Sequence, residues 1–313
     1  MPALNLNSIL VGGPCKLLDN GNAIYFEDGV KLTPHPTWRQ IPSDVGGDLD
    51  DVLVDLVWKI TGRPKSVWNA AYRASLLPDA YTNWPVSGAR FCGPANRAVS
   101  IIGADSNGFD FPRACLTKMP TVFGGVGRPL YGEVEYTAFI ADGAQVTDAN
   151  AFYSVNNTAW TQNDYPAAHQ ETLCTGAWAG VPDWDTVFAE GGFKLAHELR
   201  VSPVRQGNLT VDYRLTSYRA MISFIPQAPT VSDLLAALAL QGIAGAPAGS
   251  FGIGSRRSAT ANDFSFSGPG LSVTVKSAAV NHGVFCFDNR LNRIGEIGMI
   301  TALAQPGTRL VLA

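Results

Sequence analysis

The most regular alternation of polar and apolar residues lies at positions 133–140, which read EVEYTAFI. Glu133, Glu135, Thr137 and Phe139 share one parity, and the residues between them are all apolar. Because successive side chains of a strand point to opposite faces, this pattern predicts a strand with one wholly apolar side. The two glutamates on its other side could be half of a catalytic or metal site, or the solvated face of an ordinary sheet.

A longer alternating segment runs from Leu209 to Ile225, and its parity changes once. The apolar positions up to Leu215 are odd-numbered, and those from Tyr218 to Phe224 are even-numbered. A β-bulge near Ser217 and Tyr218 would return both sets to one face. We therefore expect a long, bent strand here, and a second strand-rich segment at residues 50–60, which read DDVLVDLVWKI.

Two other segments have the spacing of helices. Apolar residues recur at positions 67, 70, 71 and 74 in one, and at 231, 234, 235 and 238 in the other. This spacing predicts one short amphipathic helix in each of the segments 64–79 and 229–242. We expect Ser66 and Ser232 to be the N-caps, and Pro78 and Gly242 to end the helices.

These elements occur twice in the same order, which indicates an internal duplication. FEDGVKLTPH from Phe26 resembles FAEGGFKLAH from Phe188, and a strand-rich segment, a proline and a predicted helix follow each. The copies are 162 residues apart at the phenylalanines, 165 at the prolines Pro64 and Pro229, and 163 at the Gly-Glu pairs 132–133 and 295–296. Chance similarity between β-rich segments would scatter these offsets, whereas duplication keeps them nearly constant.

The pattern predicts a mainly β protein with two tandem β-sandwich or barrel domains, each flanked by one α-helix. We place the first domain at residues 1–155, a connector at 156–186 and the second domain at 187–313. The connector region is expected to be ordered, because Trp160, Trp178 and Trp184 would be costly to leave in water. Burying such a side chain stabilises a fold by about 1.5–3 kcal/mol.

The composition is that of a folded chain with many turns. Hydrophobic residues make up 46 % and charged residues 16 % of 313 residues, with 32 glycines and 20 prolines. Low charge leaves much neutral surface, which favours association with other chains. The net charge is −3, and Arg256–Arg257 is the one Arg-Arg pair, so the sequence has no basic stripe that could grip phosphates.

The sequence also bears on location. The start, MPALNLNSILVGGPCK, lacks the positive leader and apolar run of a secretory signal. The uncharged run Leu234–Ser255 is continuously apolar only to Leu240, which is too short for a bilayer core about 30 Å thick, so no membrane contact is expected. Five cysteines without a CxxC motif indicate reduced thiols in a reducing compartment.

Residue types that carry chemistry are scattered along the chain. The four histidines form no HxH or HxxxH spacing, which argues against zinc, and His35 and His197 are interpreted as equivalent structural residues of the repeat. The sequence has no GxSxG elbow, no phosphate-binding glycine loop and no complete calcium loop. We therefore predict no catalytic residues, no metal and no cofactor. A β-sandwich glycoside hydrolase stays an alternative, because acidic residues for a facing carboxylate pair are plentiful.

The segment Leu116–Val155 resembles the closing section of the major tail tube proteins of long, non-contractile-tailed bacteriophages (siphophages). The matching features are TKMP at 117–120, a glycine-rich hairpin, LYGEV at 130–134, an aromatic-aliphatic strand, and Thr147–Ala149 followed by Tyr153. About 40 residues match well, and the second copy matches only through the internal repeat.

The resemblance implies a virion protein that self-assembles into rings, which stack into a tube through which double-stranded DNA passes without sequence-specific binding. Most members have one tube domain per chain and form hexameric rings, so a duplicated chain implies a homotrimer with pseudo-sixfold symmetry, closed by head-to-tail contacts. The implied partners are further copies of the chain, a tape-measure protein, and tail terminator and tip proteins. The implied location is the viral tail, assembled in the host cytoplasm.

The carboxylates of the predicted strands are candidates for the lining of such a tube. Duplex DNA carries one negative charge per roughly 1.7 Å of its axis, so a carboxylate lining would not hold it as a lysine lining would. The candidates are Glu133, Glu135, Glu296, Asp51 and Asp55. Each of them could equally lie on a solvated outer face.

Neutral, glycine-rich loops are candidates for contacts between subunits, because they can order against a neighbour. The two loops are 124–129 and 242–254, with Gly124, Gly125, Phe251, Gly252 and Ile253 as the candidate residues. Another virion part, namely a tail terminator, a baseplate ring or a decoration protein, is an alternative to the tube.

Overall fold

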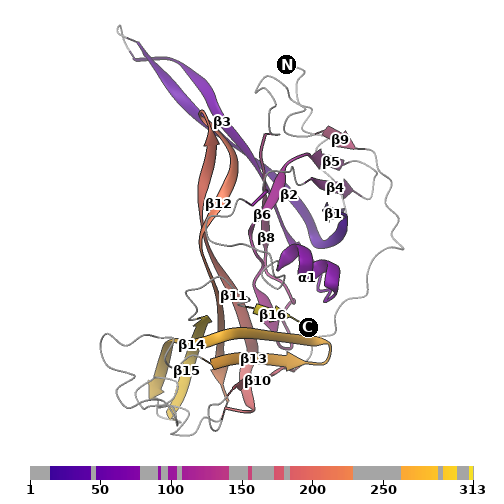
Figure 1. Cartoon of the computed structure of the whole chain (residues 1–313), viewed down its shortest axis with the longest axis vertical. Coiled ribbons are helices and arrows are strands. Elements are labelled where there is room, and N and C mark those ends of the chain that lie inside the picture. The colour runs from indigo at the N-terminus through magenta and orange to yellow at the C-terminus, as the bar shows by residue number, and fades with distance from the viewer. Residues whose placement is uncertain are drawn as a thin grey trace.

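The computed structural model describes residues 15–43, 47–77, 91–92, 98–103, 108–140, 154–156, 173–179, 184–227, 262–287, 292–301 and 310–312. Within these residues the chain is mainly β, with one short helix (Figure 1). The first half contains β1 (Cys15–Asp19), β2 (Asn22–Ser43), β3 (Gly47–Pro64), α1 (Ala70–Leu76), β4 (Val99–Gly103), β5 (Gly108–Phe111), β6 (Ala114–Lys118), β7 (Val122–Gly124), β8 (Val134–Ala138) and β9 (Ser154–Asn156). The second half contains β10 (Thr175–Trp178), β11 (Val187–Gln206), β12 (Leu209–Pro226), β13 (Asn262–Gly268), β14 (Leu271–Phe287), β15 (Asn292–Thr301) and β16 (Leu310–Leu312).

Two antiparallel sheets organise the molecule, and their strand orders match. The first runs β6-β8-β3-β2-β1-β4-β5-β9. The second runs β14-β15-β12-β11 in the same sense, and β10 then joins β11 to β13, which returns to β14. The second circuit closes into a small barrel because β14 is one long strand. In the first half the corresponding path is split into β5 and β6 at Pro112 and Arg113.

Each half is built around one long hairpin, β2–β3 in the first and β11–β12 in the second. The two ladders have register shifts at matching places: after Phe26, Thr37 and Ile41 in β2, and after Glu190, Arg200 and Val204 in β11. At the second shift, Val54 and Thr216 are the extra residues opposite the partner strand. A β-bulge is a specific local feature, and shared bulges at nearly constant spacing support the duplication that the sequence predicts.

The ladder also shows which prolines correspond. Pro64 pairs with Phe26 at the end of the first ladder away from the turn. Pro226 pairs with Ala189 at the same end of the second ladder. The predicted match of Pro64 with Pro229 is therefore wrong, because the equivalent proline lies three positions earlier.

The predicted equivalence of His35 and His197 is wrong by one residue. Pro34 lies opposite Trp58, which is two residues before Ile60 in β3. His197 lies opposite Ala220, which is two residues before Ile222 in β12. His197 therefore takes the place of Pro34 in the repeat. His35 is exposed, so the two histidines have different surroundings.

The two strand patterns of the sequence are present. β8 carries buried Val134, Tyr136 and Ala138 on its apolar face, and towards its end Thr137 and Phe139 are buried as well. The predicted bulge in β12 is confirmed, because Arg200 pairs with Ser217 while Val201 pairs with Leu215.

The helix α1 begins later than predicted. Asn69, not Ser66, is its N-cap, and the Asn69 side chain accepts a hydrogen bond from the backbone N–H of Tyr72 at 2.9 Å. The Ser66 hydroxyl instead accepts a hydrogen bond from the backbone N–H of Leu130 at 3.1 Å. Asn and Ser are about equally good N-caps, so the shift follows from the contact of Ser66 with Leu130, which leaves Asn69 to cap the helix. Pro78 and the second predicted helix, with Ser232 and Gly242, lie outside the described residues.

The core connects the two halves into one apolar body. Trp178 and Trp184 are buried as predicted, with ring centroids 5.7 Å apart in an edge-to-face arrangement. Trp178 belongs to β10, which lies within the range predicted as a connector and pairs with β11 and β13 of the second sheet. Trp160 lies outside the described residues.

Four cysteines, Cys15, Cys92, Cys115 and Cys174, are reduced and buried. Burial raises the pKa of the Cys15 thiol to about 11 and also raises the pKa of Cys174. Among the described residues, no helix is long and apolar enough to cross a membrane.

Candidate functional site: the junction of the halves and the hairpin ends

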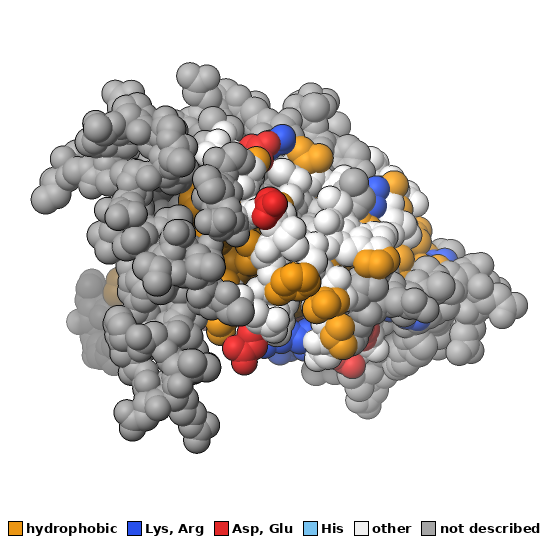
Figure 2. Space-filling model, turned by 90° about the horizontal axis from the view of Figure 1, so that it is seen from below, with side chains coloured by type: hydrophobic (Ala, Val, Ile, Leu, Met, Phe, Trp, Pro, Cys, Tyr) orange, Lys and Arg blue, Asp and Glu red, His pale blue; other side chains and the backbone are white. Residues whose placement is uncertain are grey.

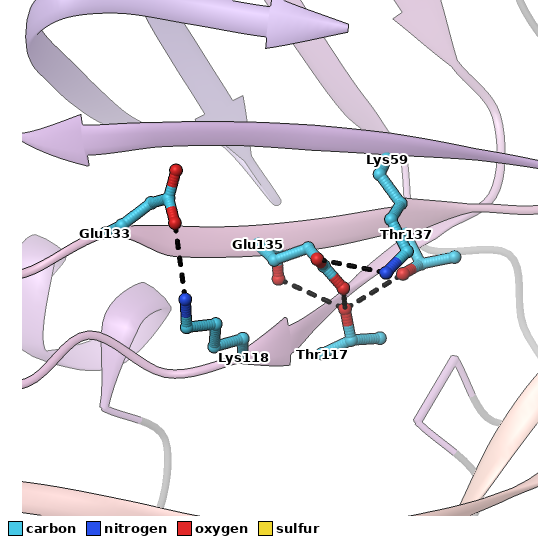
Figure 3. A network of polar contacts seen from close by, with 6 residues as sticks. All are labelled: Lys59, Thr117, Lys118, Glu133, Glu135 and Thr137. Atoms are coloured by element: carbon cyan, nitrogen blue, oxygen red, sulfur yellow. Dashed lines mark hydrogen bonds and ion pairs between the residues drawn. The ribbon is translucent and has the colours of Figure 1, made fainter. Parts of the chain in front are cut away.

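Glu135 of β8 and Glu133, which directly precedes that strand, are both paired with lysines on neighbouring strands (Figure 3). Glu133 is exposed and lies 3.3 Å from Lys118 of β6. Glu135 is less exposed, lies 3.1 Å from Lys59 of β3, and also accepts a hydrogen bond from the Thr117 hydroxyl at 3.2 Å. This face of the sheet is therefore a band of paired charges rather than a bare carboxylate surface.

The other carboxylate candidates have three different surroundings. Asp51 is exposed near the beginning of β3, and Glu296 is exposed on β15. Asp55 is instead engaged within the chain, because its carboxylate accepts hydrogen bonds from both the backbone N–H (3.0 Å) and the hydroxyl (2.6 Å) of Thr210. Asp55 belongs to β3 and Thr210 to β12, so this contact joins the two halves.

A buried ion pair lies in the same junction. The Arg113 guanidinium lies between β5 and β6 and donates to the Asp212 carboxylate of β12 at 3.3 Å, and both side chains are completely buried. Arg113 also donates to the backbone carbonyl of Val211 at 2.8 Å. The backbone N–H groups of Cys92 and Tyr213 donate to the other Asp212 oxygen, so both carboxylate oxygens accept hydrogen bonds.

Cys92, Cys115 and Asp212 are close enough together to hold a metal ion in principle. The chemistry of the group does not fit a cation, because the Arg113 guanidinium already neutralises the Asp212 carboxylate. A second positive charge at this place would be repelled. We interpret this group as a structural contact between the halves.

Apolar contacts complete the junction. Ile140 and Val211 form a small buried cluster, and four partly buried side chains pack against it: Leu56, Trp58, Val204 and Leu209. The rings of Phe139 and Tyr213 meet edge to face at 5.4 Å. Each of these contacts includes residues of both halves, so the end of the β11–β12 hairpin is docked on the first half.

A second connection lies at the other end of β11. The short strand β7 of the first half pairs with β11, as Lys194 opposite Phe123 shows. Gly192 has φ +83°, and a Cβ there would lie 2.3 Å from the carbonyl oxygen of Gly124. Gly124 itself is buried against Phe266, so glycine is required where these two strands meet.

The loop candidates are thus divided. Gly124 and Gly125 pack within the chain's own junction, whereas residues 126–129 form the exposed part of that hairpin turn, with Val126 62 % exposed. Phe251, Gly252 and Ile253 lie outside the described residues.

The end of the β2–β3 hairpin extends beyond the rest of the molecule (Figure 1). Four large apolar side chains are exposed on it: Trp38, Ile41, Val52 and Leu53. A two-stranded ribbon is marginally stable in water by itself, and apolar groups on it mark a contact surface. Figure 2 shows a different face, seen from below, where the described acidic, basic and apolar side chains are interspersed with no run of one charge.

Sequence reasoning did not find Arg113, Asp212 or Thr210. Arg113 follows FDFP and precedes ACL, so a charged residue between two apolar strands was the available signal. Asp212 and Thr210 lie in an alternating strand where polar residues are ordinary, and their partners are about 100 residues or more away in the sequence.

No family model matches the chain, and no curated protein matches it. Among solved structures, the chain is similar to one described as "Virion of native gene transfer agent (GTA) particle". The identity is 14 %, the TM-score is 0.28, and the match covers 47 % of this chain and 99 % of the other. A TM-score this low gives no basis for an inference about fold or function.

Proposed function

We propose that this chain is a structural virion protein of a phage-like particle, whose copies form stacked rings that make a tail tube. One observation carries the proposal. The chain contains two halves of the same strand order and the same hairpin irregularities, joined by a contact between unlike surfaces. A contact of that kind, repeated between chains, closes a ring when the rotation is suitable.

The number of chains follows from the repeat. Six like modules around a passage need three chains of two modules each, so we propose a homotrimer with pseudo-sixfold symmetry. The junction of the halves is then the pattern for the contact between chains. Both the resemblance of Leu116–Val155 to siphophage tail tube proteins and the repeated fold support this reading.

The charge pattern suits a passage for DNA, although not in the way expected from sequence alone. A wall of unpaired lysines would bind duplex DNA by releasing counterions. If the face with Glu133 and Glu135 lines the passage, Lys118 and Lys59 make it nearly neutral. Such a surface neither holds the DNA by its charge nor strongly repels it.

On this proposal the protein is structural rather than catalytic, needs no cofactor, and belongs to the viral tail, assembled in the host cytoplasm. Its partners are other copies of itself, a tape-measure protein inside the tube, and terminator and tip proteins at its ends. Duplex DNA passes through it during ejection without sequence-specific contacts.

Purified protein tests the proposal directly by negative-stain electron microscopy and by the mass of the particles. We expect rings of three chains that stack into tubes. Rings that never stack would favour a tail terminator or baseplate ring. A stable monomer that cleaves polysaccharide would overturn the proposal in favour of the glycoside hydrolase.

A further inference from the structure

The ends of the two hairpins correspond residue by residue. Trp38 opposite Leu53 matches Val201 opposite Leu215, directly after the bulge that both hairpins share. Ile41 opposite Asp50 matches Val204 opposite Asp212, directly before the next shared register shift.

A local hydrogen bond is consistent with this match. The backbone N–H of Asp51 donates to the Asp50 carboxylate at 2.8 Å, as the backbone N–H of Tyr213 donates to the Asp212 carboxylate at 2.7 Å. The two aspartates therefore share one local hydrogen bond to the following residue, as Asp55 also does with Leu56. The first hairpin end is built like the second.

The surroundings of the two ends differ. Asp212 is completely buried against the first half, whereas Asp50 is exposed. Leu215 is 1 % exposed, and its counterpart Leu53 is 38 % exposed. Within the described residues of one chain, the first hairpin end has the design of a docked element, but no surface covers it as the first half covers its counterpart.

We propose that the end of the β2–β3 hairpin docks on the second half of a neighbouring copy of this chain. Its contact lies on β12 at Ser217–Ala220, the positions that match Asp55–Trp58 in the repeat. This inference rests on the proposed function and names the surfaces that close the ring. The contact inside one chain between Asp55 and Thr210 then has its counterpart between chains at Ser217 and Asp48.

Two observations favour a second copy over another partner. The receiving surface is already present in every chain, because the second half repeats the fold of the half that receives the β11–β12 end. Continuing the same contact from chain to chain also leaves no hairpin end exposed in a closed ring.

The prolines of β2 bear on how the end docks. Pro34 and Pro36 remove backbone donors from β2, which beyond residue 30 pairs only with β3 among the described strands. The open edge is thus poorly suited to strand addition, and docking occurs through side-chain faces.

Paired cysteine variants test the contact. The variant with Asp48→Cys and Ser217→Cys should form disulfides between chains when assembled protein is oxidised with copper phenanthroline, giving covalent dimers and trimers on a non-reducing gel. The matched variant with Asp55→Cys and Thr210→Cys should form its disulfide within one chain and stay at the monomer position. A variant that carries only one of the two introduced cysteines of a pair is the control for random cross-linking.

A substitution on the hairpin gives an independent readout. Leu53→Asp should raise the protein concentration needed for half-maximal ring formation by at least about tenfold, because a charge replaces an apolar contact at the centre of the surface. Leu173→Asp is the matched control, since Leu173 is also exposed (62 %) but lies before β10, away from the hairpin. Circular dichroism of the monomer shows whether either variant is still folded.

The outcomes separate the two proposals. If wild-type protein forms no rings, both the proposed function and this contact are wrong. If wild-type rings form, but the Asp48–Ser217 pair gives only monomers and Leu53→Asp rings assemble normally, the contact is wrong and the ring function stands. Chain-to-chain cross-links together with the loss of assembly in Leu53→Asp support both.

Discussion

The two hairpins have the same ladder and bulges, but within the described part of the chain only one end is covered. The β11–β12 end lies on the first half, where Asp212 and Leu215 are buried, and the β2–β3 end extends into solvent with Asp50 and Leu53 exposed. Their strand pairing does not explain the difference, since the registers agree. The surroundings explain the difference, because a hairpin end is buried only where a neighbouring surface covers it.

The sequences of the two ends have diverged in the way this difference requires. Tyr213 stacks edge to face on Phe139, whereas the matching position in the first hairpin is Asp51. The Asp212 carboxylate has a buried arginine partner, which an exposed Asp50 does not need for solvation. The following changes test how far the covered end depends on contacts that the exposed end lacks in a single chain.

Removal of the Arg113 side chain should have the largest effect on the free energy of unfolding. Arg113→Ala leaves the Asp212 charge buried, and breaking a buried pair in this way costs about 3–5 kcal/mol of unfolding free energy. Urea denaturation followed by tryptophan fluorescence measures the loss. Lys118→Ala, which breaks the exposed pair with Glu133, is the control and should cost less than about 1 kcal/mol. Equal losses in both variants would show that the junction ion pair is not special.

Gly192→Ala should have the next largest effect on stability. The new Cβ would lie 2.3 Å from the Gly124 carbonyl oxygen, and the backbone has φ +83°. Overpacking costs about 1–3 kcal/mol, and the left-handed conformation adds about 1–2 kcal/mol. Gly207→Ala shares the positive φ but meets nothing within 4 Å, so thermal unfolding should show only the smaller, conformational part. A Gly207 effect as large as that of Gly192 would contradict the close approach of β7 to β11.

Thr210→Val should cost about 1–2 kcal/mol, because the hydroxyl donates a hydrogen bond to the charged Asp55 at 2.6 Å. Thr216→Val is the matched control in the same strand. Its hydroxyl donates to the Arg200 carbonyl at an exposed position, so its loss should stay below about 1 kcal/mol. Chemical denaturation compares the two, and a larger effect at Thr216 would argue against the Asp55 contact as a link between the halves.

The two histidines of the hairpins should differ in their effect on acid stability. Burial lowers the pKa of His197 from 6.5 to about 3, and its ring also contacts the Tyr218 hydroxyl at 2.9 Å. The folded state therefore favours the neutral ring, and this contribution is complete above pH 6.5 and is lost as the pH falls toward 3. Between pH 6.5 and 4.5 the wild type should lose about 1–2 kcal/mol more than His197→Gln.

His35→Gln is the matched substitution on the first hairpin, because the His35 side chain is exposed and the variant retains His197. Because it retains His197, this variant should lose stability between pH 6.5 and 4.5 as the wild type does. A wild-type curve that runs parallel to that of His197→Gln would contradict the burial of His197.

Much of the fold could be predicted from the sequence where local pattern decides it. The change of parity in 209–225 predicts the bulge because a buried face tolerates no slip. The nearly constant offset predicts the duplication, although it does not fix which proline or histidine corresponds. The length of β2 was not predicted, since Pro34, Pro36 and Pro42 argue against a strand. They are tolerated here because, among the described strands, β2 beyond residue 30 pairs only with β3.

The junction could not be predicted for a different reason. Arg113, Asp212 and Thr210 function through partners far away in the sequence, so no local pattern marks them. The same holds for Glu133 and Glu135, whose alternation was visible but whose lysine partners on β3 and β6 were not. Exposure of the β2–β3 end likewise depends on where the rest of the chain lies.

The count and arrangement of chains in an assembled ring test the central claim most directly. A cryo-EM reconstruction at a resolution that separates strands should show three chains whose six halves surround a passage as six similar units, with each β2–β3 end on the second half of the next chain. A ring of six chains, or halves that occupy unrelated positions around the passage, would contradict the account.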